Sequence, residues 1–281
     1  MNFNAVFNMM NRLFLIFTVF LFTSFFTSCM KFRTDDKQTL KFFEEKNQQV
    51  FITKDDNLRV IKTDTTNFDL AVLFIHGTPG SADAFFDYLA DSSLLSKATL
   101  ISYDRPGYGY SDYGNPMTSI KDQAGAILTT ISSYKKVFVV GHSYGGPIAA
   151  YLAINSKNIN GVVLIAPAMY PHKEKYYGMA KLGKSSIGRM FSSKALYVAS
   201  LEKIDHQSSL KEIENEWVDL NCKLVHIHSR DDKIVPFDNV DYSKKMFTSA
   251  QVQLIELQEG NHFLPWNHYD LVKATIIELI E

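Results

Sequence analysis

The sequence predicts an α/β fold with a mostly parallel central sheet and helices on both of its faces. Three observations predict it. Short apolar runs without polar alternation recur along the chain, which is typical of strands buried on both faces. Helical segments separate these runs, which implies parallel crossover connections. The 281 residues, 46% of them hydrophobic, supply enough apolar material for the core of such a sheet.

Residues 1–28 are expected to be a signal peptide. Arg12 is the only basic residue before Lys31, and an apolar stretch after it continues to Phe26. This stretch is short for a membrane span, which needs about 20 apolar residues. The tetrapeptide Phe26–Cys29 resembles the end of a bacterial lipoprotein signal. The resemblance implies lipidation at Cys29 and an exported, membrane-anchored protein. An uncleaved membrane anchor and a plain signal peptide are the alternatives.

Residues 29–44 are expected to form a tether that leads into a domain at residues 45–281. The segment Met30–Lys37 is polar and charged, as is common in linkers. Cys29 and Cys222 are the only cysteines, so lipidation of Cys29 would leave Cys222 without a disulfide partner. Cys222 is expected to be a small buried residue on a strand.

The domain is expected to begin with an antiparallel hairpin. Val50–Thr53 and Leu58–Ile61 are strand-like and are separated by Lys54–Asn57, which has the composition of a turn. The apolar runs expected as further strands are Leu70–Ile75, Thr99–Tyr103, Val137–Val140, Val162–Ile165, Leu224–Ile227 and Val252–Ile255. The expected helices are Ala82–Leu95, Ile120–Tyr134, Gly145–Asn155, Val240–Phe247 and Leu271–Ile280.

The alternation of strands and helices is interrupted between Pro167 and Asn221. No run there is typical of a central strand, and stretches such as Ser209–Val218 are typical of helices. An insertion of this size in an α/β sheet usually builds a lid over the ends of the strands. We therefore expect a small helical cap at about residues 168–220.

The segment Gly141–Gly145 matches the pattern G-x-S-x-G and lies between an apolar strand and a helix. A sharp strand-to-helix turn exposes the hydroxyl of Ser143 and requires small neighbours. The hydroxyl also lies near a helix N-terminus, whose partial positive charge favours a developing oxyanion. We therefore expect Ser143 to be a nucleophile, and a nucleophilic serine needs a base that removes its proton.

Four motifs in this order resemble those of the α/β-hydrolase superfamily, and the resemblance covers nearly all of the chain after about residue 45. They are His76–Gly80, Asp104–Gly109, Gly141–Gly146, and the pair formed by Asp232–Pro236 and Gly260–His262. The resemblance implies the α/β-hydrolase fold. It also implies that the nucleophile, the acid and the histidine follow one another along the chain.

That order leaves His262 and His268 as candidate bases. His262 follows the last strand at the carboxyl edge of the sheet, where it can meet Ser143, whereas His268 begins the terminal helix and is expected to cap it or face solvent. Asp231 and Asp232 compete as the acid, because adjacent side chains diverge, and spacing alone does not choose between them. In the family the acid stands four residues before the proline of this turn, which implies Asp232.

The resemblance also implies the two donors of an oxyanion hole. In the family they are the main-chain N–H after the His-Gly pair and the N–H after the nucleophile, which belong here to Thr78 and Tyr144. His76 is expected to hydrogen-bond the backbone of its loop, and the charges of Asp104–Asp112 are expected to hold theirs. His226 and His228 face the same side of one strand, but no third ligand lies near them, so no metal site is expected.

We expect a serine hydrolase that cleaves a small-molecule carboxylic ester, or a related acyl bond such as an amide or thioester, through an acyl-enzyme intermediate and without a cofactor. A net charge of −1 provides no field that would recruit nucleic acid. Acyl transfer to an acceptor other than water is one alternative, and a non-catalytic binding protein on the same fold is another. The sequence carries no signal for the substrate or for the oligomeric state.

Overall fold

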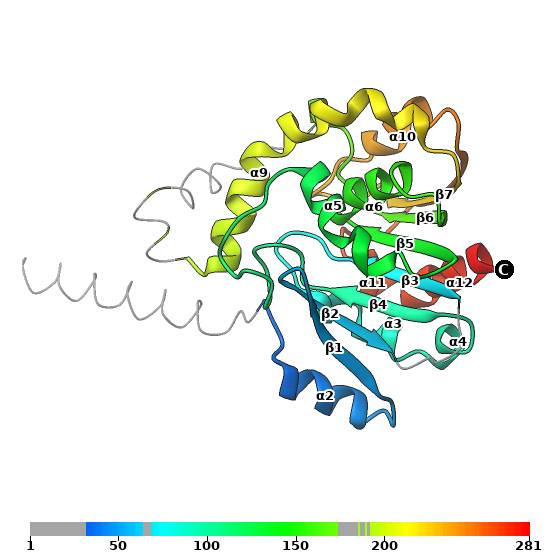
Figure 1. Ribbon diagram of the computed structural model, residues 1–281. Helices are drawn as coiled ribbons and strands as arrows, with labels where there is room; N and C mark the ends of the chain where they lie inside the picture. The colour runs from blue at the N-terminus through cyan, green and yellow to red at the C-terminus, as the bar shows by residue number, and fades with distance from the viewer. Residues whose placement is uncertain (1–31, 64–68, 174–184, 186–188, 190–191) are drawn as a thin grey trace, which may run out of the picture.

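The computed structural model describes residues 32–63, 69–173, 185, 189 and 192–281. Its centre is an eight-stranded sheet with the strand order β1-β2-β4-β3-β5-β6-β7-β8 (Figure 1). The strands are β1 (Val50–Asp55), β2 (Leu58–Thr63), β3 (Leu70–Ile75), β4 (Thr99–Tyr103), β5 (Lys136–His142), β6 (Ile159–Ile165), β7 (Lys223–Ser229) and β8 (Gln251–Leu257). The expected hairpin is confirmed, since β1 pairs with β2 antiparallel. The pair of β2 with β4 is also antiparallel, and the strands from β4 to β8 are parallel.

The helices lie on both faces of the sheet, which confirms the predicted fold class. Figure 1 shows α5, α6 and α10 on one side and α3 and α4 on the other. The helical elements in chain order are α2 (Asp36–Glu44), η1 (Ala82–Phe85), α3 (Phe86–Leu89), α4 (Ser92–Leu95), α5 (Ile120–Ile131), α6 (Gly145–Ile154), η2 (Pro171–Lys173), α9 (Lys194–Ile213), η3 (Glu214–Asp219), α10 (Asp238–Met246), α11 (Leu264–Asn267) and α12 (Tyr269–Ile280).

Strand β3 shows why these apolar runs form central strands. Leu73 packs in the core on the side of α5 and α6, while Val72 and Phe74 pack in the core on the side of α3 and α12. From Ala71 to Ile75 both faces of the strand are buried, which favours apolar side chains at each of these positions.

The single helix expected over Ala82–Leu95 is divided into η1, α3 and α4. The cause of the last division is Asp91, whose side chain accepts hydrogen bonds from the backbone N–H groups of Ser93 and Leu94. A side chain that satisfies these N–H groups caps a new helix.

Residues 36–44, which the sequence analysis assigns to a tether, instead form helix α2. Asp35 and Gln38 make a capping box at its start, and Phe43 is buried in the core. Asp36 pairs with Arg59 of β2 at 2.7 Å. The folded domain therefore already includes this helix. The charged residues at its start favoured a linker, although the helix places Phe43 on its buried face.

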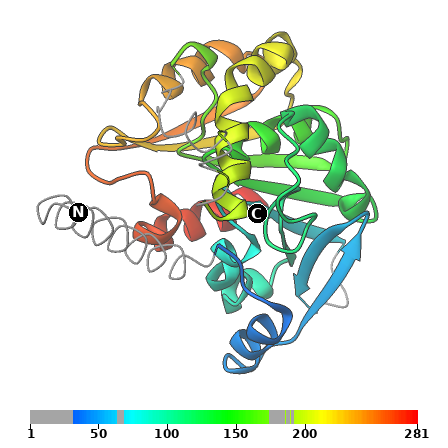
Figure 2. The same ribbon diagram turned by 90° about the vertical axis from the view of Figure 1, so that its left-hand side faces the viewer.

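The described part of the expected cap region contains the helical elements η2, α9 and η3. The 20-residue helix α9 passes in front of the sheet in Figure 2, where it is yellow-green. It contacts α5, η2 and η3. Cys29 and the expected signal peptide lie outside the described residues. Within the described ranges, no helix is long and apolar enough to cross a membrane.

Cys222 lies just before β7 rather than on it, and it is partly buried against the core. Burial raises the pKa of the Cys222 thiol to about 11. The thiol therefore stays protonated near neutral pH, which makes it a poor nucleophile.

Candidate active site

Ser143 stands in the turn that joins β5 to α6. Its φ is +55°, a left-handed conformation that is strained for a residue with a side chain. A Cβ atom on Gly145 would lie 2.3 Å from the carbonyl oxygen of Ile75, and one on Gly141 would lie 2.4 Å from that of Gly145. The turn is tight enough to admit only glycine at these positions, and it presents the Ser143 hydroxyl at the carboxyl end of β5.

The structure brings Ser143, His262 and Asp232 together. The distance from His262 Nε2 to Ser143 Oγ is 2.9 Å, and that from His262 Nδ1 to Asp232 Oδ2 is 2.8 Å. A carboxylate can only accept, so Nδ1 carries the proton and Nε2 accepts from the serine hydroxyl. The three side chains are buried, with 5–7% of their surface exposed. The arrangement can take a proton from Ser143 and stabilise the resulting imidazolium.

The loop after β7 separates the two adjacent aspartates. Asp232 Oδ1 accepts hydrogen bonds from the backbone N–H groups of Ile234 at 2.8 Å and Val235 at 2.9 Å, which leaves Oδ2 for His262. Burial by itself would raise the pKa of Asp232, but hydrogen bonds from histidine side chains and from the backbone hold it well below its usual value. Asp231 is exposed and pairs with Lys233 at 3.4 Å.

The histidine pair on β7 consists of His226 and His228, and His228 lies next to Asp232. The ring nitrogens His226 Nε2 and His228 Nδ1 are 3.1 Å apart, and His228 Nε2 lies 3.1 Å from the carbonyl oxygen of Val235 and 3.5 Å from Asp232 Oδ2. Burial and the neighbouring His228 hold the pKa of His226 well below its usual value. Among the described residues no cluster of potential ligands could hold a metal ion. The alternation of the two histidines indicated that they share a side, but not that His228 contacts Asp232.

His142 holds the backbone of the candidate base. Its Nε2 donates to the carbonyl oxygen of His262 at 2.9 Å. Burial lowers the pKa of His142 to about 3, so the ring is a neutral donor near neutral pH. The pattern G-x-S-x-G does not specify its second position, so the sequence alone indicates no role for His142.

The loop after β3 lies against Ser143. A Cβ atom on Gly77 would lie 3.0 Å from Ser143 Cβ, so the Gly77–Thr78 peptide borders the reaction centre. His76 hydrogen-bonds the loop backbone as expected: its Nδ1 donates to the carbonyl oxygen of Gly77 at 2.7 Å, and its Nε2 accepts from the N–H of Arg105 at 3.0 Å. Asp104 holds the neighbouring loops, since it accepts the N–H groups of Ala82 and Tyr110, both at 2.8 Å.

Glu202 of α9 is a buried residue that the sequence analysis missed. Its carboxylate receives Arg105 Nη1 at 2.6 Å and the Tyr108 hydroxyl at 2.6 Å. Nothing in the sequence around Glu202 distinguishes it from a solvent-exposed helix residue.

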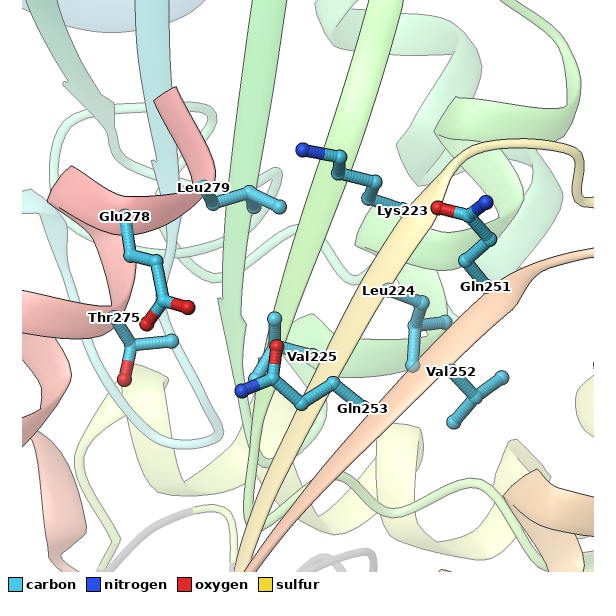
Figure 3. A pocket seen from close by; sticks show the side chains of 9 residues that line it. All are labelled: Lys223, Leu224, Val225, Gln251, Val252, Gln253, Thr275, Glu278 and Leu279. Carbon is cyan, nitrogen blue, oxygen red and sulfur yellow. The ribbon is translucent and has the colours of Figure 1, made fainter. Parts of the chain in front are cut away.

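A cavity of about 280 Å³ lies at the opposite edge of the sheet (Figure 3). Lys223 and Gln251, the first residues of β7 and β8, line it together with Thr275 and Glu278 of α12. Ser143 follows the carboxyl end of β5, so the cavity is separate from the candidate active site.

The comparisons with known proteins support this fold. A family model described as the alpha/beta hydrolase fold matches residues 71–183. Over 99 residues the chain is 34% identical to a dihydrolipoyllysine-residue acetyltransferase component of the acetoin cleaving system from Cupriavidus necator; the alignment covers 34% of this chain and 26% of that protein.

Three solved structures show the same fold. A lipase-esterase related protein from Clostridium acetobutylicum has a TM-score of 0.63 at 15% identity, covering 79% of this chain and 99% of its own. An esterase from Exiguobacterium antarcticum has a TM-score of 0.60 at 17% identity, covering 82% and 98%. A membrane phospholipase A described as a bacterial virulence factor has a TM-score of 0.64 at 13% identity, covering 99% and 97%.

Proposed function

We propose that this chain, which has the α/β-hydrolase fold, is a serine hydrolase that cleaves a small-molecule carboxylic ester through an acyl-enzyme intermediate, without a cofactor. One observation carries the proposal. His262 lies within hydrogen-bond distance of both Ser143 Oγ and Asp232 Oδ2, at 2.9 Å and 2.8 Å. This geometry is what a serine hydroxyl needs to become a nucleophile near neutral pH.

In the first half of the reaction, Ser143 Oγ attacks the carbonyl carbon of the substrate while its proton passes to His262 Nε2. The carbonyl oxygen becomes an oxyanion, which accepts hydrogen bonds from the N–H groups of Thr78 and Tyr144. When the oxyanion collapses, the ester C–O bond breaks and the leaving alkoxide takes the proton from His262. Asp232 stays ionised and stabilises the imidazolium.

In the second half, water attacks the acyl-enzyme. The water proton passes to His262 Nε2, a second oxyanion forms in the same place, and its collapse releases the carboxylic acid. Ser143 Oγ leaves and takes the proton back. His262 thus passes the Ser143 proton to the leaving alcohol in the first half and a water proton to Ser143 in the second, so the enzyme returns to its starting state.

Acyl transfer is the second candidate function, because an alcohol or amine can replace water in the second half. The acetyltransferase component with 34% identity over 99 residues supports testing it, although the alignment covers only about a quarter of that protein. Competing alcohols or amines added to an ester assay would divert the acyl group in a transferase. Product analysis separates the two functions.

We also propose that the protein is exported and anchored in a membrane through lipid on Cys29. The resemblance of Phe26–Cys29 to the end of a lipoprotein signal motivates this proposal. Phe32 packs against a cluster that contains Tyr108, from the loop after β4, and Val198, from α9. The Arg33 guanidinium lies 4.2 Å from the centre of the Tyr113 ring. Lipid on Cys29, just before Phe32, would hold the cap side of the protein near the membrane. Incorporation of a labelled fatty acid into wild type but not into Cys29→Ala tests the anchor.

A fluorophosphonate probe tests the hydrolase. We expect wild type to be labelled on Ser143, as identified by mass spectrometry, and Ser143→Ala to be folded but unlabelled. A panel of 4-nitrophenyl esters of increasing acyl length, extended to a phospholipid, then measures the substrate preference. Folded wild type that neither reacts with the probe nor cleaves any ester would contradict the proposal and favour a binding protein on this fold.

A further inference from the structure

A fully buried ion pair connects the cap to the loops around Ser143. Arg105, from the loop after β4, and Glu202, from α9, are both inaccessible to solvent. Arg105 Nη1 lies 2.6 Å from Glu202 Oε1, and Nη2 lies 3.2 Å from Oε2, so the pair is bidentate. Burial works against the charge of Arg105, but the Glu202 carboxylate outweighs it and raises the pKa of Arg105 above its usual value.

The Glu202 carboxylate accepts further hydrogen bonds from two other side chains. Gln123 Nε2 donates to Oε1 at 2.9 Å, and the Tyr108 hydroxyl donates to Oε2 at 2.6 Å. Tyr108 has only one hydroxyl proton, so the Thr78 hydroxyl, 2.5 Å from the Tyr108 oxygen, donates to it. A buried charge is costly unless its hydrogen bonds are complete, and this network completes those of Glu202. The cap therefore reaches the side chain of Thr78.

Arg105 also reaches the main chain of the same loop. Its Nη2 donates to the carbonyl oxygen of Gly77 at 3.0 Å, which also accepts from His76 Nδ1. That carbonyl belongs to the same peptide unit as the N–H of Thr78. In a trans peptide the two groups point in opposite directions, so holding the carbonyl from one side aims the N–H to the other. A cation on the carbonyl also polarises the unit and strengthens the N–H as a donor.

The second oxyanion donor is supported from the same helix. The carbonyl of Ser143, which shares a peptide unit with the N–H of Tyr144, accepts from the N–H of Ala168 at 3.1 Å. The carbonyl of Ala168 in turn accepts from His206 Nε2 of α9 at 3.0 Å. The His206 ring lies on the Tyr144 ring with 4.5 Å between centroids.

We propose that Glu202 is a positioning residue for the reaction: through Arg105 it orients the Gly77–Thr78 peptide as an oxyanion donor, so that helix α9 affects the rate of the chemical step. This inference rests on the proposed hydrolase function. Glu202 contacts none of Ser143, His262 and Asp232. Its effect therefore appears where the oxyanion is stabilised and not in the proton transfer.

The test uses two changes at the pair. Glu202→Gln keeps the shape of the side chain but leaves Arg105 as an uncompensated buried charge, and the protein could unfold for that reason alone. The double variant Arg105→Met with Glu202→Gln removes both charges at similar volume, which buried pairs commonly tolerate. It also removes the donor to the carbonyl of Gly77. Circular dichroism and thermal unfolding establish that each variant is folded.

Two controls lie on the same helix. Glu212→Gln makes the same chemical change at an exposed position of α9. Leu210→Ala opens a cavity under α9, because Leu210 is fully buried in the core, and leaves the ion pair unchanged. The first control reports the effect of the substitution itself, and the second reports the effect of destabilising the helix.

The assay is hydrolysis of 4-nitrophenyl butyrate, together with inhibition by an alkyl trifluoromethyl ketone, which forms an oxyanion adduct with a nucleophilic serine. We expect kcat of the double variant to fall about 10- to 100-fold with KM unchanged, since removing an oxyanion donor outright costs about 100- to 1000-fold. The inhibition constant of the ketone should rise by the same factor, because the adduct resembles the transition state. Glu212→Gln should match wild type.

Two outcomes would overturn the inference. The folded double variant could retain the kcat of wild type, or Leu210→Ala could lower kcat and weaken the ketone as much as the double variant does. Failure of the proposed function has a different signature, because wild type itself would then neither cleave the ester nor react with a fluorophosphonate.

Discussion

Asp232→Asn separates the two aspartates that follow β7 and tests how the candidate base is oriented. The Asn side-chain oxygen can still accept the N–H groups of Ile234 and Val235 at the 2.8 Å and 2.9 Å positions, so the loop should keep its shape. The change falls at Oδ2, where an NH₂ donor would replace the acceptor of His262 Nδ1, now 2.8 Å away. His262 would then lose the proton on Nδ1 and carry it on Nε2.

A proton on Nε2 prevents His262 from accepting the proton of Ser143. Inverting the tautomer in this way costs about 10⁴-fold in kcat, or about 5 kcal/mol in the activation free energy. The loss of a hydrogen bond to a charged group should cost about 1.5–3 kcal/mol of folding stability, so the protein should stay folded. The large kinetic loss and the small stability loss are therefore distinguishable in one variant.

Asp231→Asn is the matched control, because Asp231 is the adjacent residue and is exposed. The assay measures 4-nitrophenyl ester hydrolysis and the rate of fluorophosphonate labelling for wild type and both variants, with thermal unfolding beside them. We expect Asp231→Asn to match wild type. If Asp232→Asn kept its activity while Asp231→Asn lost it, the orientation that we derive from the loop would be refuted.

Three further predictions concern the histidine beside the nucleophile, the tight turn and the oxyanion loop. The pKa of His142 in the folded protein, about 3, lies below its unfolded value of 6.5, so the unfolded chain binds more protons between these values. The fold should lose stability as pH falls from 6.5 toward 3, by up to about 1.4 kcal/mol per pH unit for this group. Urea unfolding at several pH values measures this, and the free energy of unfolding should fall less steeply with pH in His142→Gln than in wild type. An equal dependence on pH in both proteins would contradict the prediction. Gly145→Ala should abolish labelling of Ser143, because its Cβ would lie 2.3 Å from the carbonyl oxygen of Ile75, and a labelled, stable variant would show that the turn can open. Thr78→Ala should lower kcat/KM less than tenfold, because the proposed donor is the backbone N–H and the side chain loses only its bond to Tyr108, a bond worth about 1 kcal/mol; a much larger loss would assign the side chain a direct role.

The strands were predictable because their composition is dictated by burial. A strand such as β3 is covered on both faces, and its run of apolar residues follows directly from that. Helix α2 was not predictable to the same degree. It has few apolar residues, and the charged residues before it favoured a tether, although the contact of Asp36 with Arg59 binds it to the domain.

In the candidate site, too, some residues were predictable from the sequence and others were not. Ser143 was predictable from a local pattern, because a tight strand-to-helix turn requires glycines close to it in the sequence. Asp232 could be separated from Asp231 only by resemblance, because the two residues have the same chemistry and nearly the same position in the chain. The structure separates them by the direction of their side chains, one toward His262 and the other toward Lys233.

By itself, the sequence determined the class of fold, because apolar runs of consecutive residues identify buried strands. Its resemblance to a known superfamily implied the order of the proposed nucleophile, acid and histidine along the chain. Only the tertiary structure decided which distant groups act on them. His142 holds the carbonyl of His262, and Glu202 of α9 pairs with Arg105. These contacts join segments that no periodicity or spacing relates. They form because buried polar and charged groups must find partners, and the fold determines which partners lie within reach.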